Sequence, residues 1–211
     1  SQTCTVTGGA GTVGGAIVTS VTVTCVTPSP RFAYVANFPD NSVSIYTVNA
    51  VTGQLRLKGY VAAGIRPLMV SIDPAGKFAY VANNSDGSFA TSTVSVYAIN
   101  SSTGALTEVL GSPFPARSNP WFVSVHPSGK FAYVANNGDA SVSVNAIDAS
   151  TGALISPPGV RVPVGLNPHS VTVDPSGKFA YVTNRGSNTV SAIAINSGTG
   201  ALTEVAGSQF T

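Results

Sequence analysis

The chain has 211 residues, of which 43% are hydrophobic but only 9% are charged, and its net charge is +2. Charged residues make up about 25% of a typical soluble domain, so the surface must be rich in serine, threonine, asparagine and glycine. The basic residues are scattered without a run, which argues against nucleic acid and anionic membranes as partners. No apolar stretch reaches the roughly 18 residues that a membrane span needs.

The first 27 residues contain both cysteines, Cys4 and Cys25. Alternating residues at 3–7 and 16–26, separated by glycine turns within 8–15, predict two or three β-strands. An even cysteine count in a charge-poor, Thr/Ser/Gly-rich chain favours an oxidising compartment and one disulfide between the outer strands. Two unpaired buried thiols are the alternative. The segment also resembles a cysteine-bracketed β-repeat of large bacterial surface proteins.

One motif occurs four times: a basic residue, then Phe-Ala-Tyr-Val, then Ala or Thr, then Asn. Its tyrosines are spaced 46, 53 and 48 residues apart. A repeat of roughly 40–50 residues built from short strands is typical of a propeller blade, and no helical apolar period is present. The four copies are Arg31–Asn37, Lys77–Asn83, Lys130–Asn136 and Lys178–Asn184.

The last copy shows the predicted pattern of one blade. Residues 170–173 form an inner strand, and Asp174-Pro175-Ser176-Gly177 forms a tight turn in which Pro fixes φ and Gly supplies a positive φ. Residues 179–183, 189–195 and 201–206 alternate and are predicted as the second, third and outer strands. The second and third copies repeat this order. We therefore predict an all-β propeller of four blades.

The first copy differs because Pro28-Ser29-Pro30 replaces the turn. Its inner strand is then predicted at Val21–Val26, which makes the N-terminal β unit, residues 1–27, continuous with the first blade. The propeller repeats occupy residues 28–211. The predicted blades span about 21–66, 67–119, 120–167 and 168–211. Four blades could form a small closed ring, a fragment of a larger propeller, or an open arc that pairs with other copies of itself.

The repeated Tyr-Val-Ala/Thr-Asn and Thr-Gly-Ala-Leu elements resemble the YVTN-type propeller repeat. Residues 28–211 are similar to the lactonase family of seven-bladed propellers, which includes bacterial 6-phosphogluconolactonases and fungal muconate cycloisomerases. This resemblance implies that His169, in Pro168-His169-Ser170-Val171, is an active-site histidine, and Arg66 and Arg185 are candidate cations for the oxyanion or phosphate. Thr183-Asn184-Arg185-Gly186 stands where the family has an acidic element, so the expected acid is absent.

Other polar residues have simpler explanations. His126 replaces the aspartate of the turn, so we expect a turn role for it. Glu108 and Glu204 share a Leu-Thr-Glu-Val context on outer strands, which indicates a structural role. Asn83 and Asn100 begin glycosylation triplets. We predict neither a cofactor nor a metal site.

The sequence therefore favours a secreted or cell-surface structural module, and it favours a non-catalytic protein over an enzyme. The motivating features are the few charges, the low blade count and the absence of polar caps. Such a module would form a homo-oligomer or polymer, as a filament or tube, through strand edges and terminal blades. The alternatives are a lactonase-like hydrolase of sugar lactones and a ligand- or glycan-binding propeller.

The disulfide between Cys4 and Cys25 gives a direct prediction. Reduction of the native protein should raise its intact mass by two hydrogens, because one S–S bond becomes two thiols. Thiol-reactive label on the unreduced native protein would contradict the pairing.

Overall fold

The computed structural model describes residues 3–7, 22–26, 31–85, 91–155 and 161–210. These residues form β-strands, with one short 3₁₀ turn, η2, at Asn137–Asp139. None of the helical segments among them is long and apolar enough to cross a membrane. The all-β prediction is confirmed.

Four of the sheets are propeller blades built from consecutive antiparallel strands. The first blade contains β3 (Arg31–Asn37), β4 (Ser42–Val48) and β5 (Leu55–Ala62). The second contains β6 (Pro67–Ile72), β7 (Phe78–Asn83), β8 (Thr93–Ile99), β9 (Leu106–Glu108) and β10 (Phe114–Pro115).

The third blade contains β11 (Pro120–Val125), β12 (Phe131–Asn136), β13 (Ser141–Ile147), β14 (Leu154–Ile155) and β15 (Arg161–Pro163). The fourth contains β16 (Pro168–Val173), β17 (Phe179–Asn184), β18 (Thr189–Ile195) and β19 (Leu202–Phe210). In these last three blades the motif strand lies between an inner strand and a third strand, as the sequence predicts.

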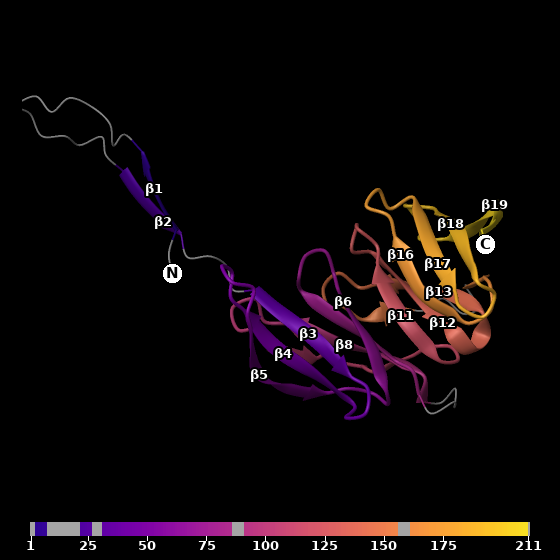
Figure 1. Cartoon of the computed structure of the whole chain (residues 1–211), viewed down its shortest axis with the longest axis horizontal. Helices are drawn as coiled ribbons and strands as arrows, with labels where there is room; N and C mark the ends of the chain where they lie inside the picture. Colours follow the sequence, from indigo (N-terminus) through magenta and orange to yellow (C-terminus); the bar gives the residue numbers. More distant parts are fainter. Residues whose placement is uncertain (1–2, 8–21, 27–30, 86–90, 156–160, 211) are drawn as a thin grey trace, which may run out of the picture.

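The prediction that Val21–Val26 forms the inner strand of the first blade is wrong. Strand β2 (Thr22–Val26) pairs instead with β1 (Thr3–Thr7), in a two-stranded hairpin apart from the blades (Figure 1). An alternating Thr/Val segment presents the same two faces to either partner, so its sequence does not decide between β1 and a blade strand. The first blade therefore has three strands among the described residues.

The hairpin register places Cys4 directly opposite Cys25. Directly opposed residues of an antiparallel pair have Cα atoms about 4.5–5.5 Å apart, within the range that a disulfide spans. The disulfide stays a prediction that the backbone register supports. The predicted turns at 8–15 and 28–30 lie outside the described residues.

The blades are arranged as an open arc (Figure 1). The inner strands β6, β11 and β16 are successive neighbours, and β3 lies beside β6. The first and fourth blades lie at opposite ends of the arc, so the four blades do not close on themselves as a small ring.

The hydrophobic core is divided among the three junctions between blades. One cluster joins the first and second blades, through residues such as Val43 and Val81, and a second joins the second and third blades. The third joins Tyr133 and Val142 of the third blade to Val182 and Ile193 of the fourth. Burial therefore depends on contact between neighbouring blades.

A recurring contact fixes each junction. The motif tyrosine of one blade donates a hydrogen bond to a glycine carbonyl in the outer turn of the next: Tyr34 to Gly104 (2.9 Å), Tyr80 to Gly152 (3.1 Å) and Tyr133 to Gly200 (3.2 Å). The motif phenylalanine lies against the same glycine, where a Cβ would collide with its ring. We call this the Phe-Tyr contact.

Burial raises the pKa of the Tyr80 and Tyr133 hydroxyls well above the ordinary value of 10.0. The folded state therefore favours their neutral form. Their contribution to stability is complete below pH about 10 and is lost as the pH rises further.

The closing asparagine of each motif is also structural. Asn83 is fully buried, and its Nδ2 donates to Thr93 Oγ1 (3.0 Å) and Ser95 Oγ (2.9 Å) on β8. A glycan on Asn83 therefore does not fit the folded blade. Asn100 lies in an exposed turn, where its Oδ1 accepts bonds from the Ser102 and Thr103 amides, and glycosylation there stays a prediction.

The Phe-Tyr contact predicts the effect of removing one hydroxyl. Tyr133→Phe should lower the free energy of unfolding by about 1 kcal/mol, because it deletes a buried hydrogen bond and leaves the Gly200 carbonyl without its donor. Urea unfolding followed by circular dichroism measures this change.

The matched control is Tyr181→Phe. Tyr181 is 46% exposed, whereas Tyr133 is 0% exposed. The control should change the stability of the isolated chain by less than about 0.5 kcal/mol. Equal losses for the two variants would contradict the structural role of the contact.

Candidate functional site

The inner strands begin with a shared backbone feature. Each starts at a proline that follows a non-glycine residue with positive φ: Arg66 (54°), Asn119 (51°) and Asn167 (51°). A register shift follows directly after the proline in each strand. Such a bulge re-aims the side chain at the extra position, which is Leu68, Trp121 or His169 in the successive blades.

His169 therefore lies at the start of β16, beside β11 of the third blade. Its ring packs on Trp121 of the third blade, with ring centroids 4.5 Å apart and planes tilted by 37°. Both side chains are half-buried. The contact fixes the imidazole from one side while leaving part of it accessible to solvent.

A hollow of about 360 Å³ lies on the accessible side of His169. It opens on the fourth blade between the start of β16 and the end of β19. Besides His169, its lining includes Arg185, Thr183, Asn188 and Phe210. Arg185 is exposed, as are Thr183 and Asn188. The structure thus brings an imidazole and a guanidinium to one solvent-filled space with hydroxyl and amide groups.

Arg66 does not belong to this hollow. It precedes β6 in the second blade, and its guanidinium carbon lies 5.7 Å from the centroid of the Phe38 ring. Its Nη1 donates to the Ser85 carbonyl at 3.5 Å. Of the three candidate residues, His169 and Arg185 line the same hollow, and Arg66 lies elsewhere.

The hollow has no carboxylate in its lining. The Asp139 carboxylate is held by Arg161 at 2.6 Å and Arg117 at 3.2 Å. Partial burial works to raise its pKa, but hydrogen bonds from Arg161 and Ser141 and the two positive charges lower it overall. Within the described part of the chain, no three His, Cys, Asp or Glu side chains are grouped as a metal site.

His126 has a structural role that includes more than its own turn. Its Nδ1 accepts a bond from the Ser128 amide (3.0 Å), and its Nε2 lies 2.9 Å from the Gly177 carbonyl of the fourth blade. A neutral imidazole protonated on Nε2 satisfies both contacts. The expected turn role is confirmed, and the link between blades is an addition that the sequence did not reveal.

Comparison with known proteins agrees with the propeller fold. The family model described as "Lactonase, 7-bladed beta-propeller" matches residues 19–122 and 110–209. No curated protein matches the chain. Solved structures provide the remaining comparisons.

A candidate 6-phosphogluconolactonase from Bacteroides uniformis superposes with a TM-score of 0.72 at 20% identity, and a second from Bacteroides fragilis with 0.69 at 23%. The periplasmic gluconolactonase of Pseudomonas aeruginosa gives 0.66 at 21%. Each alignment covers 82% of this chain and 50% of the other. The chain thus spans about half the length of these propellers, and the likeness shows the fold.

Trp121 is the only tryptophan in the sequence, so its fluorescence reports on His169 directly. His169→Ala should shift the emission to longer wavelength, because removing the packed ring exposes the indole to water. Arg185→Ala serves as the control and should leave the emission unchanged, since the structure shows no ring contact between Arg185 and Trp121. Identical spectra for His169→Ala and the wild type would contradict the packing.

Proposed function

The chain belongs to the lactonase family of seven-bladed β-propellers, and from that membership we propose that it is a lactonase-type hydrolase of sugar lactones. The observation that supports this proposal most strongly is that His169 and Arg185 line one hollow on the fourth blade. This proposal replaces a purely structural role as the leading hypothesis.

The chemistry requires a base and a group that stabilises negative charge. Neutral His169 removes a proton from water, and the resulting hydroxide equivalent attacks the lactone carbonyl carbon. The Arg185 guanidinium donates to the carbonyl oxygen as it becomes an oxyanion. The C–O bond of the ring then breaks, and protonated His169 returns its proton to the departing alkoxide. The product is the open hydroxy acid.

The remaining lining suits a sugar. Thr183 and Asn188 provide hydroxyl and amide groups for the substrate hydroxyls. The Thr183 hydroxyl lies 2.8 Å from the Ser170 hydroxyl, which orients it. Phe210 adds an apolar surface for one face of the sugar ring. Because the hollow lacks a carboxylate, an anionic lactone meets no repulsion there and gains attraction from Arg185.

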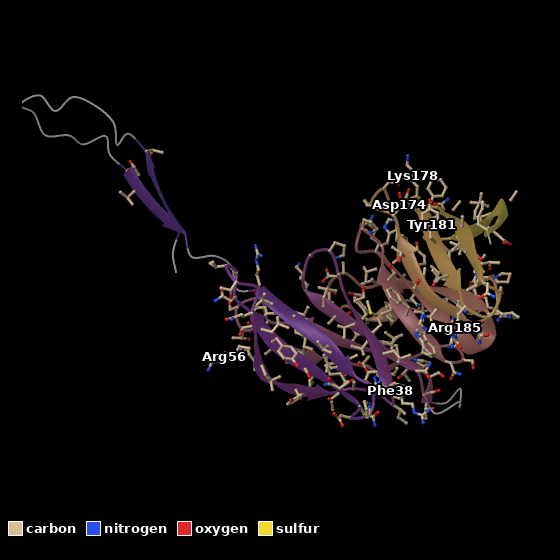
Figure 2. All side chains as sticks on the ribbon, viewed as in Figure 1. Phe38, Arg56, Asp174, Lys178, Tyr181 and Arg185 are labelled. Atoms are coloured by element: carbon tan, nitrogen blue, oxygen red, sulfur yellow. The ribbon has the colours of Figure 1, made fainter. Side chains whose placement is uncertain are left out.

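The test is hydrolysis of glucono-δ-lactone, followed by acid release in a pH-stat with the uncatalysed rate subtracted. His169→Ala should lower kcat/KM by roughly 10²–10⁴-fold through loss of the base. Arg185→Ala should lower it by roughly 10²–10³-fold through loss of oxyanion stabilisation. Arg56→Ala removes an exposed cation at the other end of the arc (Figure 2) and should leave the rate unchanged.

A wild-type rate equal to the blank, or equal rates for wild type and His169→Ala, would overturn the hydrolase proposal. Lactone or glycan binding that shifts Trp121 fluorescence without hydrolysis would instead favour the ligand-binding alternative.

A structural, self-associating module is the second candidate function. It is favoured by the open arc, whose first and fourth blades each have one flank without a neighbouring blade among the described residues (Figure 1). We also propose an extracellular or cell-surface location, supported by the opposed cysteines of the hairpin.

A further inference from the structure

The outer flank of the fourth blade carries half of a blade junction. Alternate residues of β17 are exposed, whereas all residues of β7 and β12 are buried. Phe179 is 40% exposed, compared with 8% for Phe131 in the third blade. The Tyr181 hydroxyl makes no hydrogen bond to any described residue, although its three counterparts each donate to a glycine carbonyl. This flank therefore presents a Phe-Tyr pair without a glycine turn.

The outer flank of the first blade carries the other half. Gly53 occupies the place of Gly104, Gly152 and Gly200, with the same positive φ (72°). Those three glycines are buried under a phenylalanine ring, but Gly53 is exposed and nothing described lies within 4 Å of where its Cβ would be. This flank therefore presents a glycine turn without a Phe-Tyr pair.

A hollow of about 330 Å³ adjoins the Gly53 turn. Thr47, Val48 and Leu55 contribute to its lining, and Leu55 is 56% exposed. The same flank exposes Val35 at 44%, whereas its counterparts Val81 and Val182 are 0% exposed. The first blade thus offers a recess beside the turn, lined by Val48 and Leu55 together with the polar Asn49, Gln54 and Arg56, where a phenylalanine ring lies at the other junctions.

We propose that the fourth blade of one chain docks against the first blade of a second copy through the Phe-Tyr contact. In that interface Phe179 enters the recess, and the Tyr181 hydroxyl donates to the Gly53 carbonyl of the other molecule. A second copy is the occupant because both halves of the contact are present on the same molecule. The interface continues the geometry of the three internal junctions.

The contact is head-to-tail, because it joins two different surfaces. Two copies that close on each other give eight blades, which is within the range of about 4–8 known for propellers. Copies that do not close give an open polymer. Either assembly contains the same junction, so its existence does not depend on the final symmetry.

The docking surface adjoins the hollow at His169, because Thr183, the third exposed residue of β17 on this flank, lines that hollow. Phe179 and Tyr181 do not line that hollow. The first blade lacks an inner strand among the described residues, so a docked copy supplies no described strand to cover the start of β16. Assembly is followed by sedimentation and hydrolysis by acid release, so the two proposals are tested by separate measurements.

Sedimentation velocity over a concentration series tests the proposal with two variants. Tyr181→Lys places a charge on the fourth-blade flank, and Gly53→Asn places a side chain where the phenylalanine should lie. Asparagine tolerates the positive φ at this position. The wild type should associate, and each variant alone should associate at least tenfold more weakly.

Mixing the two variants gives the sharpest result. Tyr181→Lys retains an intact first blade and Gly53→Asn an intact fourth blade, so the mixture should form a one-to-one heterodimer that grows no further. A symmetric contact between two fourth blades would not be rescued in this way.

Two controls separate the interface from general effects. Ser197→Lys adds the same charge to an exposed outer turn of the fourth blade, and Gly76→Asn makes the same change at another exposed glycine with positive φ (67°). Both should associate like the wild type, and circular dichroism should show all variants folded. A wild type that stays monomeric up to millimolar concentration, or a variant mixture without heterodimer, would overturn the proposal.

Discussion

The architecture depends on a contact in which one blade inserts a phenylalanine and a tyrosine over a glycine of the next blade. The glycine is required twice, since its positive φ forms the turn and its missing Cβ leaves room for the ring. Burial of each aromatic side chain contributes about 1.5–3 kcal/mol, and a buried hydroxyl-to-carbonyl bond adds orientation. The contact occurs between blades, so no single blade is complete.

This dependence explains why the arc has two unlike ends. The fourth blade has an aromatic pair with nothing to cover, and the first has a turn with nothing covering it. The candidate active site lies at the end of the fourth-blade flank, where the bulge that begins β16 adjoins Thr183 of β17. There His169 packs on Trp121 and lines one hollow together with Arg185. The motif strand of each repeat thus packs against the neighbouring blade, and the residues at the start of each inner strand are available for chemistry.

Much of the fold could be predicted because the motif encodes it locally. The alternation of Phe-Ala-Tyr-Val predicts the buried strand, and Asp-Pro-Ser-Gly predicts the turn, in which Asp174 accepts bonds from the Lys178 and Phe179 amides. The position of His169 directly before an inner strand could also be predicted from the sequence. The pairing partner of β2 could not be predicted, because a Thr/Val alternation fits a hairpin or a blade equally well.

The parts that could not be predicted depend on contacts between blades. The packing of Trp121 on His169 joins residues 48 positions apart, and the His126 contact with Gly177 joins residues 51 positions apart. The repeat period places Trp121 and His169 at equivalent positions of neighbouring blades, but it does not show that their rings touch. The exposure of Gly53 could not be predicted either. Its Thr-Gly turn has the same sequence as those of the other blades and differs only because no described blade covers it.

The central claim is that a blade flank with an uncovered Phe-Tyr pair binds the first blade of another copy. Electron-microscope class averages of the purified chain test it most directly. The account predicts particles in which four-blade arcs are joined end to end, with continuous density between the last blade of one arc and the first of the next. Isolated arcs with both flanks free at every concentration, or closed discs of four blades, would contradict it.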